Sequence, residues 1–111
     1  MEFVHRQEEN RLLVKIGGKI GPGDAEDLYH RVTTLIAPAH REILMDISNV
    51  SVVSGNALAK LSLLNNRVTK MGKRLFLTGV GKSLFRLFDV VGLDSLVIDQ
   101  PATSQTQPPA I

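Results

Sequence analysis

The stretch EILMDISNVSVVSGNALAKL, residues 42–61, contains a strand, a junction and the start of a helix. Its first six residues form a short apolar run of strand length. From residue 58 onward, apolar residues recur at helical spacing, at Leu58, Leu61, Leu64, Val68 and Met71. Three small polar residues, Ser54, Gly55 and Asn56, separate the two patterns. A strand followed at once by an amphipathic helix predicts an α/β unit, and the polar trio is a candidate phosphorylation site, anion cradle or helix cap.

Upstream of this unit, residues 2–7 and 11–17 read as two strands joined by a polar turn. The apolar residues of RLLVKI form a run rather than a strict alternation, which favours a strand buried on both faces or nearly so. The segment GGKIGPGD follows and indicates a stop and a turn. Gly23 or Asp24 then caps a first helix, whose apolar stripe comprises Ala25, Leu28, Val32, Leu35 and Ile36.

Downstream, RLFLTG (residues 74–79) reads as a strand, SLFRLFDVV (83–91) as a helix and SLVI (95–98) as a last short strand. The third helix has its apolar face at Leu84, Leu87, Phe88 and Val91. Glycines at 72 and 92 stand where helices commonly end. The resulting order is β-β-α-β-α-β-α-β. It predicts one α/β domain over residues 1–99, with helices packed on a mostly parallel or mixed sheet.

Residues 100–111, QPATSQTQPPAI, are rich in proline and polar residues and carry no charged side chain. Such a segment buries too little apolar surface to offset the entropy of ordering it. We expect a disordered C-terminal tail rather than a linker to another domain.

The composition narrows the class of protein. The 111 residues suffice for one core, there is no cysteine, and the net charge is +2 with acidic and basic residues interleaved. Scarce aromatics and the lack of a basic cluster argue against a nucleic-acid binder. No apolar run resembles a signal peptide or a membrane span, so we expect a cytoplasmic protein without membrane insertion.

The most tempting catalytic motif is TGVGKSLF, residues 78–85, where Gly81, Lys82 and Ser83 follow a strand and open a helix. A phosphate-binding P-loop has this context. That motif requires a glycine at the position of Phe76, and the loop that begins at Gly79 is too short to wrap a phosphate. Nucleotide or anion binding at residues 79–83 therefore stays a minor alternative beside a simple helix cap at Ser83.

No other pattern assembles an active site. His5, His30 and His40 lie on separate elements and lack metal-ligand spacing, so we expect surface histidines. Ser54 lies outside any G-x-S-x-G nucleophile motif. We expect a binding module without enzyme activity, cofactor or metal.

The order of elements, together with KIGPGDAEDL, the 42–61 stretch, KMGKRLFLTG and LFRLFDVVGLDSL, resembles the STAS domain of bacterial anti-sigma factor antagonists. The resemblance covers about residues 3–98. It implies a protein that binds an anti-sigma factor, itself a serine kinase, and thereby frees a sigma factor. In that family the junction usually reads Asp-Ser-Ser/Thr-Gly-Leu, and one of its hydroxyl groups is phosphorylated by the partner kinase.

This sequence departs from the family pattern at the junction. With Leu58 aligned, Ala57 takes the glycine position, Gly55 and Asn56 take the hydroxyl positions, and Ser54 takes the aspartate position. Ser54 would be a displaced phosphoacceptor, one residue early, and that shift turns a side chain by about 100° on a helix. In the preceding loop, Gly21 replaces a common aspartate, and Asp24 stands where Thr or Asn is common. The resemblance implies a partner surface made of Gly21, Asp24, Ser54, Gly55, Asn56, Ala57 and Lys60.

Two functions remain open on these grounds. The chain is an antagonist-type module without the usual phosphorylation switch, or a constitutive STAS scaffold within a signalling or transport complex. A homodimer through an exposed edge strand is a further expectation.

Overall fold

The computed structural model describes residues 1–99, and the predicted tail lies outside them. Four strands form one sheet in the order β1-β2-β3-β4. They are β1 (Glu2–Gln7), β2 (Arg11–Ile20), β3 (Glu42–Val53) and β4 (Arg74–Thr78). The β1–β2 pair is antiparallel, whereas β2–β3 and β3–β4 are parallel. The mixed α/β architecture predicted from the sequence is confirmed.

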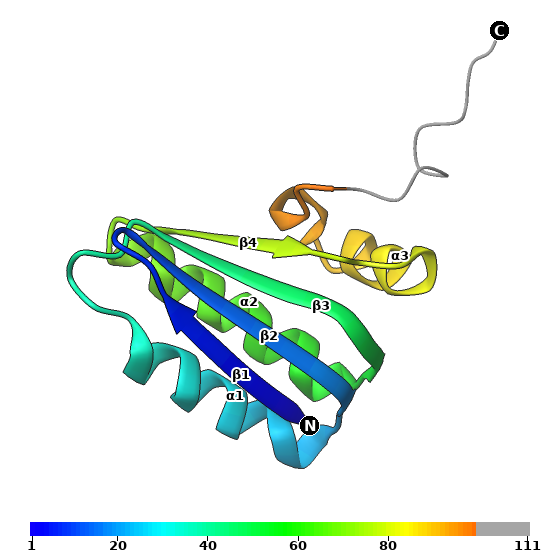
Figure 1. The fold of residues 1–111 in the computed structure, drawn as a ribbon. Coiled ribbons are helices and arrows are strands. Elements are labelled where there is room, and N and C mark those ends of the chain that lie inside the picture. The colour runs from blue at the N-terminus through cyan, green and yellow to red at the C-terminus, as the bar shows by residue number, and fades with distance from the viewer. Residues whose placement is uncertain (100–111) are drawn as a thin grey trace, which may run out of the picture.

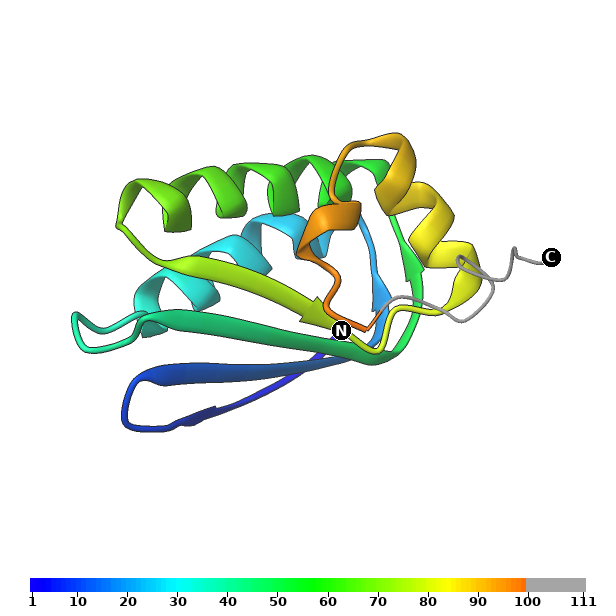
Figure 2. The same cartoon turned by 90° about the horizontal axis from the view of Figure 1, so that it is seen from above.

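Helices α1 (Pro22–Leu35) and α2 (Gly55–Lys70) pack on one face of the sheet, and α3 (Lys82–Val90) follows β4 at the end of the sheet (Figure 1). Seen from above, the helices lie on the same side of the sheet, and no other described element covers the opposite face (Figure 2). The aliphatic core lies between helices and sheet. Its largest fully buried side chains include Phe88, Leu12, Ile16, Ile43 and Leu64.

The helix stripes predicted from the sequence are buried in their central parts. Ala25, Leu28 and Val32 of α1 and Leu61, Leu64 and Val68 of α2 are buried. In α3 only Leu84 and Phe88 are buried, whereas the predicted core positions Leu87 and Val91 are 43% and 47% exposed. The third helix packs along a narrower stripe because it lies beyond the end of the sheet.

The predictions for three strands, β2, β3 and the last one, are corrected. Strand β2 is buried on one face only, because Leu12, Val14 and Ile16 point to the helices while the alternate residues face away. It also continues beyond the predicted end at Gly17, through Gly18 to Ile20, since β3 supplies backbone partners along this stretch. Pairing with a neighbour has overridden the weak strand preference of glycine.

Strand β3 extends to Val53 rather than ending at residue 47, and register shifts interrupt its pairing with β2. The predicted last strand is replaced by a 3₁₀ turn, η1 (Asp94–Leu96), and a single bridge between Val97 and Leu77. The chain turns tightly after α3, so only one residue reaches β4.

The α1–β3 connection is held by a buried histidine, against the expectation of a surface one. His40 is 3% exposed, and its Nδ1 accepts a hydrogen bond of 2.9 Å from the backbone N–H of Ala37. The ammonium group of Lys73 donates to the backbone carbonyls of Pro38 and His40. The imidazole satisfies an otherwise unpaired amide at the end of α1.

Candidate functional site

The predicted site residues gather at one edge of the sheet, where the three parallel strands end. Residues 21–24 follow β2, residues 54–57 follow β3 and residues 81–83 follow β4. Ile20 pairs with Val53, so the first two segments lie next to each other. The backbone N–H of Ser54 also donates to the carbonyl of Ile20 at 2.9 Å. Open α/β sheets commonly bind their ligands at this carboxyl edge.

Ser54 is the N-cap of α2. Its Oγ accepts a hydrogen bond of 3.0 Å from the backbone N–H of Ala57, and its carbonyl accepts one from Leu58 at the same distance. Among the three capping residues left open by the sequence, the structure selects Ser54. Its side chain is half-buried, and the hydrogen bond from Ala57 shows that its oxygen is directed at the helix backbone.

Gly55 and Asn56 form the exposed first turn of α2. A Cβ atom at residue 55 would meet no other atom within 4 Å, so the space in front of this turn is open. Ala57 differs from them because it is completely buried. Its methyl group packs in the core, which removes it from the predicted contact surface.

Helix α1 starts two or three residues earlier than predicted. Gly21 is the N-cap, and Pro22 occupies the first helical position. The Asp24 carboxylate accepts a hydrogen bond of 2.9 Å from the backbone N–H of Gly21. Asp24 therefore stabilises the helix start from within the first turn rather than as the cap residue.

Lys60 contacts the first helix. Its Nζ lies 2.7 Å from Glu26 Oε1 and 5.3 Å from the centre of the Tyr29 ring. The hydrogen bond and positive charge of Lys60 hold the pKa of Glu26 below its ordinary value of 4.5, and His30 adds a smaller effect in the same direction. Sequence reasoning missed this pair because its members lie on different helices, where no spacing rule applies.

The third predicted segment begins α3, with Gly81 as N-cap and without a side-chain cap. The predicted Ser83 cap is wrong, since Ser83 lies inside the first turn. Gly81, Lys82 and Ser83 are exposed. The loop from Gly79 to Gly81 is short and packs closely against β3. A Cβ atom at Gly79 would lie only 2.6 Å from that of Ser48.

A family model described as "Mlab, STAS domain" matches residues 3–98. The chain belongs to the STAS domain family. A similar protein is the anti-sigma-B factor antagonist of Staphylococcus aureus, 26% identical over 84 residues, which are 76% of this chain and 78% of that protein. The resemblance inferred from the sequence is confirmed.

Two solved structures show the same STAS fold. The anti-sigma factor antagonist SpoIIAA in its unphosphorylated form superposes with a TM-score of 0.77 at 13% identity, covering 93% of this chain and 91% of that one. A sulfate transporter family protein from Wolinella succinogenes gives 0.66 at 21% identity, covering 77% and 73%. The fold thus occurs in proteins with different roles, and function must be argued from the surface.

Within residues 1–99 of this STAS domain, no helix has both the length and the apolarity to cross a bilayer. The same residues contain no group of three His, Asp or Glu side chains arranged to hold a metal ion.

Proposed function

We propose that this STAS domain is a non-enzymatic interaction module that binds an anti-sigma factor, or a related serine kinase, through the surface at the start of α2. The relation to the S. aureus antagonist supports this class of partner. The surface comprises Gly21, Asp24, Gly55 and Asn56, with Ser54 beneath it and Lys60 one turn further along the helix.

One observation carries the proposal that binding lacks the usual phosphorylation switch. The exposed turn of α2 presents Gly55 and Asn56, neither of which has a hydroxyl group. The one hydroxyl of residues 54–57 belongs to Ser54, and it already accepts the N-cap hydrogen bond. A phosphate would add nearly two negative charges and repel a docked partner. Without an acceptor on the exposed turn, the charge of this surface stays constant.

The structure also bears on the nucleotide alternative. Only three residues, Gly79 to Gly81, join β4 to α3, and the first of them packs against Ser48. A P-loop needs a longer backbone loop to surround a phosphate. Titration of the protein with ATP or GTP tests this alternative, and we expect no heat of binding at millimolar nucleotide.

The second candidate function is a constitutive scaffold subunit of a signalling or transport complex. The structural likeness to a sulfate transporter family protein favours it. Both functions use the same surface, and they differ in the identity of the partner.

A capture experiment tests the surface and identifies the partner. Tagged wild-type protein and a Gly55→Arg/Asn56→Arg variant are used as bait in a lysate of the native cell, and the bound proteins are identified by mass spectrometry. A Ser62→Arg/Asn66→Arg variant carries the same added charge on exposed positions further along α2 and serves as the control.

We expect the wild type and the control to retain one partner that the first variant loses. An anti-sigma factor or serine kinase as that partner supports the main proposal, whereas a transporter or sensor subunit supports the second candidate. Equal capture of the same partners by all three proteins would place the interface elsewhere.

A further inference from the structure

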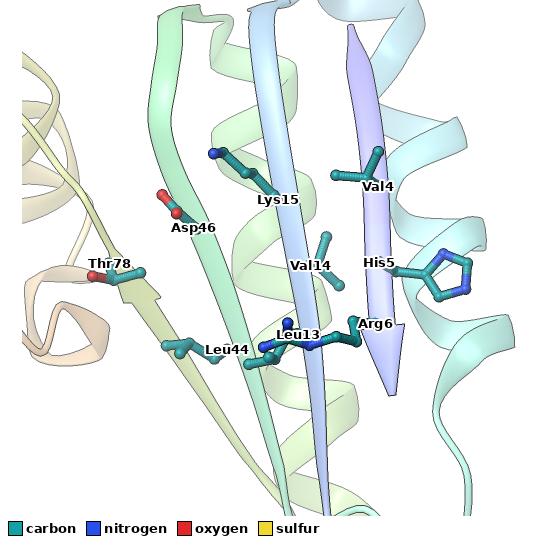
Figure 3. A pocket seen from close by; sticks show the side chains of 9 residues that line it. All are labelled: Val4, His5, Arg6, Leu13, Val14, Lys15, Leu44, Asp46 and Thr78. Atoms are coloured by element: carbon teal, nitrogen blue, oxygen red, sulfur yellow. The ribbon is translucent and has the colours of Figure 1, made fainter. Parts of the chain in front are cut away.

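The face of the sheet opposite the helices carries an ordered pattern of side chains. Alternate residues of β2, β3 and β4 point to this face, and the strand register arranges them in three rows. The rows are Arg11–Glu42–Arg74, Leu13–Leu44–Phe76 and Lys15–Asp46–Thr78. Strand β1 adds Arg6 beside Leu13 and Val4 beside Lys15. Figure 3 shows most of these side chains standing in front of the sheet around a hollow of about 350 Å³.

An apolar centre on this face is bordered by charge. Leu13, Leu44 and Phe76 are half-buried although no helix of the described residues covers them, and Val4 is 61% exposed. The guanidinium of Arg74 lies 5.5 Å from the centre of the Phe76 ring. On one side of them, Arg11 pairs with Glu42 at 3.4 Å. On the other side, Lys15 and Asp46 are neighbours in the register. Apolar sheet faces are normally covered by another layer.

We propose that a second copy of this chain covers the face, in a symmetric dimer whose two-fold axis runs along the strands between β2 and β3. This inference does not depend on the proposed function. The start of α2 belongs to the helical layer on the other side of the sheet, so both copies keep that surface free (Figure 2).

Charge complementarity supports this arrangement. The axis places β2 of one copy over β3 of the other at the same level along the strands. Arg11 then faces the second copy's Glu42, Lys15 faces its Asp46, and Leu13 faces its Leu44. The Arg11 and Glu42 side chains of the two copies form a cluster of four with alternating sign, and so do Lys15 and Asp46. The apolar rows meet in the middle, as in an aligned sheet sandwich.

The other face-to-face symmetry is unfavourable. A two-fold axis across the strands reverses the rows, so that Arg11 faces Lys15 and Glu42 faces Asp46. Both contacts bring like charges together, which opposes association. The order of the charged and apolar rows therefore favours the arrangement whose two-fold axis runs along the strands.

The size of the face sets the expected strength. Four strands about 4.8 Å apart and about six residues long, at about 3.3 Å each, present roughly 400 Å² in projection. Specific complexes commonly bury about 800 Å² on each partner. We therefore expect a reversible dimer that forms at high micromolar concentration and dissociates on dilution.

A charge-swap experiment on the full chain tests the dimer by sedimentation velocity over a range of concentrations. Arg11→Glu makes the first row acidic at positions 11 and 42, and Glu42→Arg makes it basic at both. Each variant alone brings four like charges together and should be monomeric. Their equimolar mixture pairs opposite charges and should dimerise as the wild type does.

Leu44→Lys should abolish the dimer by placing charges in the apolar centre. Val90→Lys, at an 84% exposed position on α3, is the matched control and should leave it intact. Circular dichroism verifies that each variant is folded. A wild type that stays monomeric at high concentration, or a dimer that survives Leu44→Lys, would overturn the proposal. A stronger dimer of Arg11→Glu alone would also overturn the proposal. Only the arrangement with the two-fold axis across the strands predicts that result, because residue 11 then faces Lys15.

Discussion

At the scale of single residues, Ser54 defines the candidate site. Serine and aspartate are both preferred N-cap residues, because each offers an oxygen to the free N–H groups of the first helical turn. The family pattern places aspartate at this position, and Ser54 caps α2 through the N–H of Ala57. The cap function is thus met by a different side chain, while the neighbouring hydroxyl positions hold Gly55 and Asn56.

This role predicts the effect of two substitutions. Ser54→Ala removes the cap and should lower the free energy of unfolding by about 1 kcal/mol. Ser54→Asp retains an acceptor oxygen beside the positive end of the helix dipole and should stay close to the wild type. Urea unfolding followed by circular dichroism measures both. If both variants lost the same free energy of unfolding, Ser54 would not stabilise the helix as its N-cap.

The ion pair between the helices predicts a change in titration. Lys60→Met should raise the pKa of Glu26 towards 4.5, because the hydrogen bond and charge that lower it are removed. Since the folded-state pKa is lowered, the stabilisation by Lys60 is present above the unfolded-state pKa and is lost as the pH falls through the folded-state pKa. NMR titration of the side-chain carboxyl carbon reports the shift. Lys70→Met, at the far end of α2, should leave it unchanged.

At the scale of elements, the junction of β4 and α3 depends on a close approach to β3. Gly79 has φ of +75°, and a side chain there would collide with Ser48. The backbone at Gly79 therefore lies directly against Ser48 of β3, where the two strands approach the carboxyl edge of the sheet.

Gly79→Ala should therefore destabilise the fold by more than the backbone term of about 1–2 kcal/mol that a positive φ imposes on a residue with a side chain. Gly92→Ala provides the control, because Gly92 has φ of +80° but open space around it. The difference in unfolding free energy between the two variants isolates the steric contact. If the two variants were equally stable, the close packing against Ser48 would carry no cost.

The elements also show what sequence reasoning can and cannot provide. Helical spacing located α1 and α2 because their central apolar residues alternate with exposed ones at a period close to 3.6. The ends of β2 and β3 were missed, since GGKIGPGD indicates a turn and residues 48–53 were assigned to no element. Pairing between the two strands extends both of them. The predicted last strand failed for the opposite reason, since SLVI reads as a strand but lacks a continuous partner. Its apolar residues pair at one position only, Val97 with Leu77.

At the scale of the whole molecule, the sequence predicted the STAS family and the α/β architecture, because strand-like and helical patterns alternate along the chain. It did not predict that Lys60 joins Glu26, that His40 is buried or that one face of the sheet is open. These features depend on which elements become neighbours and on which side the helices pack. The protein has two separate surfaces as a result, one at the start of α2 and one on the bare sheet.

The most direct test of the central claim is the affinity of the captured partner for this protein before and after incubation with ATP, measured by biolayer interferometry with intact mass spectrometry of the same sample. We expect an unchanged affinity and an unchanged mass of this chain. Loss of binding after ATP, together with a phosphate on Ser54, would contradict the account.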